Sequence, residues 1–373
     1  MDSDRARTAR VGSLAVRDRG RGGGLRVRRG IGDVLLVLRR ASGLTQGELA
    51  DRVGMTQATL SRYEHDLREV DDDAAQRLAD ALGVTAEFLR HDFRMEGAIA
   101  ADAHMRRQKT ARPSDWKHVE ARLNALRMHS SFVLSRVPMR PRNHVIQVDP
   151  DETSPTEAAA MLRAAWRMPI GPVRHLVRWI ESAGVLVVEE DFGSARIDGM
   201  SQWAGDHALI LANTARPTDR LRLTLAHELG HLVMHSGMVD RDAESQANEF
   251  GAEFLLPAAA IGPELHNLSL GKLADLKVEW GVSMQAIFER AYALGKVSAA
   301  ERTTFYRQLS KRGWRTREPG SDLIPPEEPK LARSIGDGLR STGLSESEVA
   351  RLIGTQADQD TPFLARRRRL QVV

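Results

Sequence analysis

The chain has 373 residues, with 54 lysines and arginines against 50 aspartates and glutamates, so its net charge is only +4 and a general polycation is excluded. A hydrophobic fraction of 42% is ordinary for a globular protein of two or three domains, and the absence of cysteine excludes disulfides and thiolate metal sites. No apolar run is long enough to span a membrane, and the basic N-terminus lacks the apolar segment of a secretory signal. We therefore expect a cytoplasmic protein with no membrane contact.

Two stretches near the termini are strongly basic. Residues 1–30 carry nine arginines against three aspartates, and residues 366–369 read RRRR. Low apolar content predicts that residues 1–30 form a disordered basic arm. This arm is either a solvated tail or a segment that binds phosphate groups.

Residues 31–93 are predicted to be all-helical, because their apolar residues recur at helical spacing. Thr45, followed three residues later by Glu48, has the pattern of a capping box. Gly54 is expected to end the helix that starts there, and Thr56 to cap the next one.

The segment LRRASGLTQGELADRVGMTQATLSRYEHD within this region resembles the XRE or Cro/C1-type helix-turn-helix family, over about residues 31–90. The resemblance implies a helix at 45–52, a turn at Gly54 and a reading helix at 56–64 that enters the major groove. It implies DNA as the partner of residues 31–93 and, because such readers commonly bind two half-sites, a homodimer. The predicted DNA-binding residues are Gln46, Thr56, Gln57, Thr59 and Arg62.

Two physical arguments support the assignment of these residues to DNA binding, and one feature of the sequence opposes it. Gln46 stands at a helix N-terminus, which favours a phosphate contact, and a glutamine on the reading helix can pair with adenine. The acidic run Asp71–Asp73 would repel phosphate if it faced DNA. A protein-interaction role for the domain therefore stays open.

The segment from 94 to 150 is predicted to be a connector, with a helical pattern from Ser114 and a strand in HVIQV at 144–148. From 151 to 319 the pattern is mixed. VLVVEED and HALILAN read as strands among several helices, which predicts an α+β domain.

The last segment, 320–373, is predicted to be a proline-rich linker followed by a small helical appendage. GLSESEVARLIG at 343–354 aligns without gaps with GLTQGELADRVG at 43–54. No reading helix is expected after it, because TQADQDTPFL is acidic and contains Pro362.

The stretch LRLTLAHELGHLVMH at 221–235 has the H-E-x-x-H pattern of zinc hydrolases. A helix of 3.6 residues per turn places His227 and His231 on one face, within reach of a single ion. Glu228 lies next to that face and can act on a water molecule as general base. A catalytic zinc site needs a third protein ligand, which in a chain without cysteine is His, Asp or Glu.

The helix downstream, in DRDAESQANEFGAEFLLP, offers that ligand. Glu244 and Asn248 are four residues apart and share a face, so Glu244 can bind the metal while Asn248 hydrogen-bonds a ligating histidine. His235, four residues after His231, is a rival ligand. No oxyanion-stabilising side chain follows from the pattern, and His207 and Tyr292 are the candidates.

RLRLTLAHELGHLVMH followed by ESQANEFGAEFLLP closely resembles the ImmA/IrrE (M78) metallopeptidases, over about residues 150–320. The resemblance implies a zincin-like domain with a Zn²⁺ cofactor, held by His227, His231 and Glu244, with Glu228 as the base. It also implies a protein substrate that is a transcriptional repressor. Gly251 and Phe254 stand where the family more often has Ala and Leu, which concerns packing.

The predicted fold is an all-α helix-turn-helix domain plus an α+β zincin-like metallopeptidase domain at 151–319, mostly helical overall. The predicted function is a DNA-binding transcriptional regulator whose zinc endopeptidase cleaves a repressor or another regulatory protein. The alternative is a non-enzymatic DNA-binding regulator, or an antitoxin-like protein, whose peptidase-like domain senses a ligand or a metal.

Overall fold

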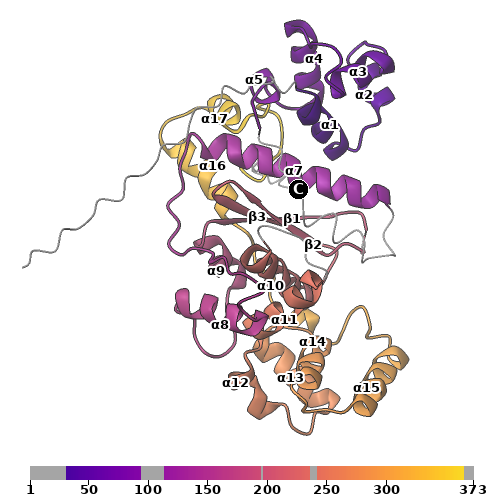
Figure 1. Ribbon diagram of the computed structural model, residues 1–373, viewed down its shortest axis with the longest axis vertical. Helices are drawn as coiled ribbons and strands as arrows, with labels where there is room; N and C mark the ends of the chain where they lie inside the picture. The colour runs from indigo at the N-terminus through magenta and orange to yellow at the C-terminus, as the bar shows by residue number, and fades with distance from the viewer. Residues whose placement is uncertain (1–30, 94–112, 195, 236–241, 365–373) are drawn as a thin grey trace, which may run out of the picture.

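The computed structural model describes residues 31–93, 113–194, 196–235 and 242–364, and the basic stretches at 1–30 and 366–369 lie outside them. The described chain passes from a helical N-terminal group through one long helix into a small sheet with helices on both faces (Figure 1). Of the helices in this described part, none combines the length and apolar content needed to cross a bilayer.

The N-terminal group confirms the predicted helix-turn-helix. Its helices are α1 Gly32–Ala41, α2 Gln46–Arg52, α3 Gln57–Glu64, α4 Asp72–Leu82 and α5 Ala86–Leu89. Thr45 and Glu48 form the predicted capping box, and the Thr56 hydroxyl accepts from the backbone N–H of Thr59 at 3.2 Å. A buried ion pair of Arg39 with Glu64 ties α1 to the end of α3.

The acidic run at 71–73 has a local explanation. Asp71 caps α4 by accepting from the backbone N–H of Ala74 at 2.8 Å, and Asp72 and Asp73 follow in the first turn. Carboxylates at this position stabilise the positive end of a helix. The run thus begins α4.

Helix α7, Pro113–Leu134, forms most of the described part of the predicted connector. It packs on α1 on one side and on the sheet on the other (Figure 1). One set of its buried residues joins the core of the N-terminal group, and another joins the core on the sheet. The first set is Ala121, Ala125, Met128 and Phe132, and the second is Trp116, Val119, Leu123, Leu126, Val133 and Leu134.

The sheet has three strands in the order β1-β3-β2. Their bounds are β1 Val185–Glu190, β2 Gly199–Ala204 and β3 His207–Asn213. β1 pairs with β3 in parallel, with Val187 opposite Ile210, and β2 pairs with β3 antiparallel. Alternate residues of β1 and β3 enter different cores, so both faces are buried and both strands read as continuous apolar runs.

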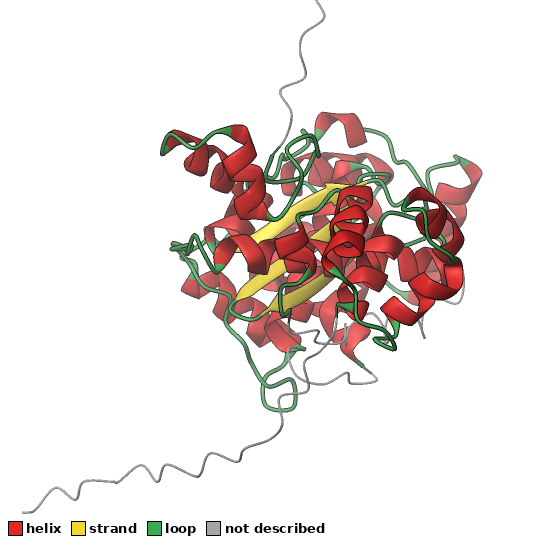
Figure 2. Ribbon diagram, turned by 90° about the horizontal axis from the view of Figure 1, so that it is seen from above, coloured by secondary structure: helices red, strands yellow, loops and turns green. Residues whose placement is uncertain are grey.

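Helices cover both faces of this sheet (Figure 2). α7 and α16, Leu331–Ser341, lie on one face, and α9 and α10 lie on the other. The helices of the second side and of the lower part of the molecule are α8 Pro155–Ala165, α9 Leu176–Ser182, α10 Thr218–Met234, α11 Ala243–Leu255, α12 Ala258–Ile261, α13 Leu270–Trp280, α14 Met284–Ala293 and α15 Ala299–Lys311. The α+β prediction is confirmed.

The C-terminal segment consists of α16 and α17, Glu346–Ile353, and docks on the N-terminal group. Val84 and Thr355 form an antiparallel bridge. The backbone N–H of Thr85 donates to the Gly354 carbonyl, and that of Gln356 donates to the Gly83 carbonyl, each at 3.0 Å. Segments some 270 residues apart in the chain are thereby joined, as Figure 1 shows for α17 beside α5.

Three elements differ from the sequence predictions. Residues 144–148 do not form the predicted strand, although the backbone N–H of Val148 donates to the Val233 carbonyl. β2 was not predicted, because Gly199, Ser201 and Gln202 interrupt its apolar pattern. Helix α15 was also missed, since most of its side chains are exposed and polar.

Candidate functional site

The candidate site is built on α10, which is buried on nearly all sides. Its apolar residues pack between the sheet and helices α8, α9 and α11. Within this apolar helix, Glu228 is only 2% exposed and His231 6% exposed, and His227 is half-buried. Polar side chains in such surroundings need partners, and the partners are in α11 and β2.

His227, His231 and Glu244 bring their ligand atoms together. His227 Nε2 lies 3.1 Å from His231 Nε2, 3.7 Å from one Glu244 carboxylate oxygen, and His231 Nε2 lies 3.4 Å from the other. Ligand atoms about 2.0–2.1 Å from a tetrahedral zinc ion are roughly 3.4 Å apart. The spacing and the nitrogen and oxygen donors therefore fit Zn²⁺, with three protein ligands.

The side chain of Asn248 contacts His227, which is the contact that the sequence predicted. Its Oδ1 lies 3.0 Å from His227 Nδ1, whereas the ring nitrogen that faces the other ligand atoms is Nε2. Because an amide oxygen only accepts, this contact favours the tautomer with the proton on Nδ1, in which Nε2 has the lone pair that a metal would need.

His235, the rival candidate ligand, lies outside the ligand cluster. Its Nδ1 lies 3.1 Å from His231 Nδ1, behind the ligating ring, and its Nε2 lies 2.7 Å from Gln246 Oε1. The ligand cluster in the described residues consists of His227, His231 and Glu244. The i, i+4 spacing alone could not distinguish the two roles, because a helix places both rings on the same side.

Glu228 is held by a residue that the sequence analysis missed. The Ser201 hydroxyl, on β2, donates to Glu228 Oε2 at 2.7 Å and contacts the Glu228 carbonyl at 3.1 Å. Gly199 makes room beside them, since a Cβ there would lie 3.2 Å from Glu228 Cγ and 2.9 Å from Thr224 Cγ2. A fixed carboxylate next to the ligand cluster is the arrangement that a general base requires.

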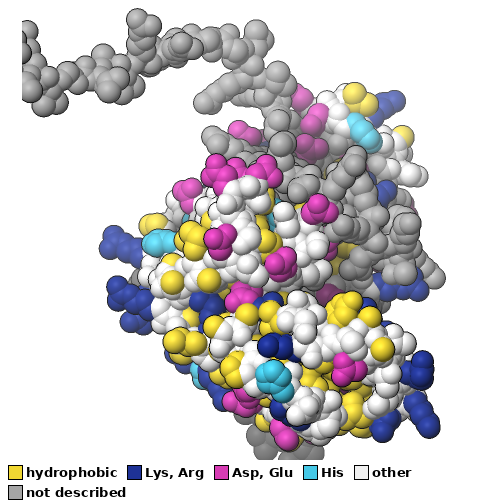
Figure 3. Space-filling model, turned by 60° about the horizontal axis from the view of Figure 1, so that its bottom comes forward, with side chains coloured by type: hydrophobic (Ala, Val, Ile, Leu, Met, Phe, Trp, Pro, Cys, Tyr) yellow, Lys and Arg dark blue, Asp and Glu magenta, His cyan; other side chains and the backbone are white. Residues whose placement is uncertain are grey.

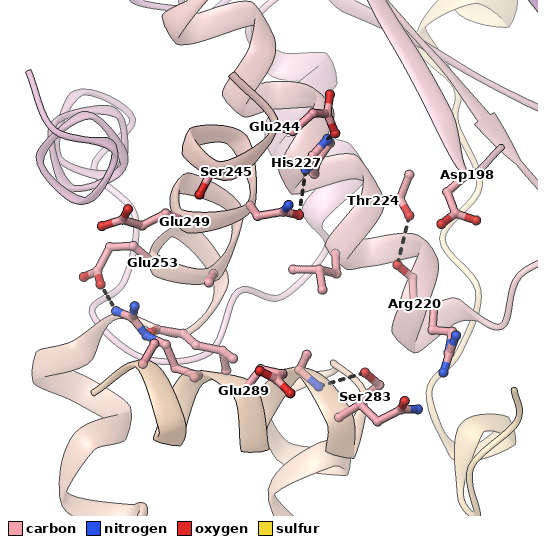
Figure 4. A pocket seen from close by; sticks show the side chains of 18 of the residues that line it. Asp198, Arg220, Thr224, His227, Glu244, Ser245, Glu249, Glu253, Ser283 and Glu289 are labelled. Carbon is pink, nitrogen blue, oxygen red and sulfur yellow. Dashed lines mark hydrogen bonds and ion pairs between the residues drawn. The ribbon is translucent and has the colours of Figure 1, made fainter. Parts of the chain in front are cut away.

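His227, Glu228 and Glu244 line a large cleft of about 1230 Å³ between α10, α11 and α14 (Figure 4). Its walls carry several charged side chains, some of them paired with one another. Arg216 Nε lies 2.5 Å from Asp198 Oδ1, and Arg290 pairs with Glu253. The volume exceeds that of a typical small-molecule pocket and suits a peptide segment. The oxyanion candidates His207 and Tyr292 do not line it.

The surface of this lower part of the molecule is unevenly charged. Figure 3 shows lysine and arginine side chains toward both sides of the face that comes forward, with acidic side chains between them.

The predicted DNA-binding residues lie at the start of α2 and along α3. Gln57 and Arg62 are exposed, Thr59 is half-buried, and the Thr56 hydroxyl lies 2.9 Å from that of Thr59. Gln46 Nε2 donates to the buried Glu64 carboxylate at 2.8 Å, so its amide nitrogen is used inside the domain. The predicted phosphate contact of Gln46 stays a prediction, now for its remaining polar groups.

Two family models match the chain. A model of the IrrE N-terminal-like domain, Peptidase_M78, matches residues 180–292, and a helix-turn-helix model, HTH_3, matches residues 36–89. A comparison with curated proteins finds no match. The first model spans β1 through α14 and so contains the ligand cluster, and the second spans α1 to α5. The two matches confirm the predicted pair of families and their order: a helix-turn-helix region is followed by a metallopeptidase-like domain of the M78, IrrE-like type.

Proposed function

We propose that this protein is a DNA-binding transcriptional regulator with a zinc-dependent endopeptidase, which cleaves a repressor or another regulatory protein. The observation that carries the proposal is the convergence of His227, His231 and Glu244 on one point beside a cleft, with Glu228 next to them. Packing between two helices does not by itself require three potential ligand atoms to lie within 4.8 Å of one another.

The chemistry assigned to each residue follows from its position. A bound zinc ion acts as a Lewis acid toward water and a peptide carbonyl oxygen. Glu228, held by Ser201, takes a proton from the attacking water and delivers it to the leaving amine. Asn248 keeps His227 in the ligating tautomer.

The DNA-binding half of the proposal rests on α3. Its exposed Gln57 and Arg62 are the side chains best placed to reach base edges, with Thr56 and Thr59 at its N-terminus. Helix α7 packs on α1 and on the sheet, so the reading helix and the cleft belong to one packed unit. A peptidase held in this way would act on proteins gathered at the same DNA site. A homodimer on two half-sites remains our expectation for the bound state.

The first experiment is zinc analysis by mass spectrometry on purified wild-type protein and a His227→Ala/His231→Ala variant. We expect about one zinc per wild-type chain and none in the variant. Glu228→Gln should keep its zinc and lose cleavage of a peptide library that the wild-type protein cuts. Absence of zinc, even after it is added, would contradict the peptidase and favour the sensing alternative. Bound zinc without cleavage would also favour that alternative.

DNA binding is tested separately, on oligonucleotides selected from a random pool by the full chain. Arg62→Ala should cost about 1–3 kcal/mol if the side chain reads a base, and should relax the preference at one position. The matched control is Arg307→Ala, an exposed arginine on α15. Failure to select any sequence would contradict operator recognition and favour a protein-interaction role.

A further inference from the structure

A line of hydrogen-bonding groups runs behind the candidate metal centre. Gln246 Oε1 lies 2.7 Å from His235 Nε2, and His235 Nδ1 lies 3.1 Å from His231 Nδ1. We propose that Gln246 and His235 are positioning residues that set the tautomer of His231, so that its Nε2 presents a lone pair to a metal. This inference rests on the proposed zinc function, which it deepens.

The direction of the line follows from what each group can do. An amide oxygen accepts and never donates, so the proton of a neutral His235 ring is on Nε2, facing Gln246. Its Nδ1 is then an acceptor, and His231 must donate from Nδ1. A neutral imidazole carries one N–H, and His231 Nε2 is therefore left without a proton.

The opposite orientation of the Gln246 amide would reverse every step. The amide nitrogen would donate to His235 Nε2, His235 would donate from Nδ1, and His231 would carry its proton on Nε2. That proton would stand at the point shared with His227 and Glu244, where a metal ligand needs a lone pair. A glutamine two steps from the metal thus determines whether His231 can bind it.

Apart from His235, which directly follows α10, helix α11 supplies the groups that this arrangement needs from outside α10. Glu244 is the third ligand, Gln246 begins the line to His231, and Asn248 acts directly on His227. The two ligating histidines are therefore held in the same tautomer in two ways. His227 is half-buried and meets an amide directly, whereas the more deeply buried His231 is reached through His235.

The test uses the full chain and three substitutions. Gln246→Leu removes the acceptor, Gln246→Glu keeps an acceptor and removes the donor, and His235→Leu removes the middle ring. The matched control is Gln308→Leu, an exposed glutamine on α15. Melting curves by circular dichroism establish that each variant is folded.

The first readout is the zinc dissociation constant, measured by competition with a chelator. We expect Gln246→Leu and His235→Leu to raise it roughly 10–100-fold, as the loss of such partners generally does. Gln246→Glu should bind zinc at least as tightly as the wild-type protein, and Gln308→Leu should be unchanged. Equal affinities in wild-type protein and Gln246→Leu would overturn the proposal, and so would a Gln246→Glu variant as weak as Gln246→Leu.

The second readout needs no metal and separates this inference from the proposed function. Nitrogen-15 spectra of labelled histidines, in the zinc-free protein at alkaline pH, report which ring nitrogen of His231 is protonated. The expected result is protonation at Nδ1 in the wild-type protein and a mixture in Gln246→Leu. Protonation of His231 at Nε2 in the wild-type protein, or no change in Gln246→Leu, would overturn the inference even if zinc binds. If zinc does not bind, the proposed function fails while these spectra still test the line.

Discussion

The candidate base, Glu228, depends on two small residues of β2. Ser201 donates to its carboxylate at 2.7 Å, and Gly199 leaves the space that the side chain occupies. Neither residue belongs to the H-E-x-x-H pattern, and each lies more than twenty residues before it. The orientation of the base is thus set by a strand whose sequence carries little strand signal.

Replacing Ser201 by alanine should impair the base while sparing the metal ligands. A hydrogen bond to a charged group contributes about 1.5–3 kcal/mol, so kcat/KM on a peptide-library substrate should fall roughly 10–100-fold. Zinc content by mass spectrometry should not change. The control is Ser347→Ala, an exposed serine on α17. If Ser201→Ala also lost zinc, Ser201 would be supporting the whole site and not the base alone.

Among the elements, the pair α10 and α11 determines the geometry of the candidate site, because all three candidate ligands come from it. The two helices approach closely at glycines. A Cβ at Gly251 would lie 3.1 Å from the backbone N of His227 and 3.3 Å from the Ala226 carbonyl carbon. The corresponding Cβ at Gly230 would lie 2.9 Å from the Phe250 ring. Gly251, which departs from the usual family residue, therefore allows α11 to approach the backbone of α10 beside His227.

The substitution Gly251→Ala should lower the melting temperature and weaken zinc binding. Alanine favours a helix by about 1 kcal/mol over glycine, but here its methyl group meets the backbone of a buried helix that cannot move aside. Gly338→Ala is the matched control. Gly338 is exposed within α16, with no atom within 4 Å of a Cβ, so the change should raise the melting temperature. Stabilisation by both substitutions would contradict the role given to Gly251.

On the scale of the whole molecule, α7 and the C-terminal segment join the N-terminal group, α1 to α5, to the metallopeptidase-like domain. His129 of α7 lies at this junction. Its ring stacks on Phe88 of α5 at 4.2 Å between centroids, and its Nδ1–H donates to the Ile353 carbonyl of α17 at 3.0 Å. Gly354 continues the junction, since a Cβ there would lie 2.2 Å from the Phe88 ring. One imidazole thus touches elements from both ends of the described chain.

This junction should weaken in acid. Burial lowers the pKa of His129 to about 4, partly offset by its bond to Ile353, whereas the unfolded chain takes up a proton near pH 6.5. The unfolded state then binds more protons between these values, so stability is full above about pH 6.5 and falls as the pH drops toward 4. Between pH 7 and pH 4.5, the melting temperature of the His129→Gln variant should fall less than that of the wild-type protein. Parallel curves for the two proteins would contradict this assignment.

The sequence predicted the helix-turn-helix, β1, β3 and the shared face of His227 and His231, because each of these depends on short-range spacing. A capping box, a helix face and a buried strand follow from residues within one or two turns of each other. The sequence did not predict β2, whose place in the sheet comes from pairing with β3. It also predicted a strand at 144–148, where the structure has none. The sequence predicted a helix in the region of α7. It did not show that the two buried sides of this helix pack on two different cores.

By itself, the sequence determined that His227 and His231 share a face, as they do in any α-helix, and named Glu244 of the next helix as a candidate third ligand beside the rival His235. Only the tertiary structure decided that His235 stands behind His231, that Ser201 holds Glu228, and that the C-terminal segment lies on the N-terminal group. The physical reason is the range of the contacts. Spacing along a helix is imposed by local geometry, whereas contacts between distant elements depend on how complete surfaces pack together.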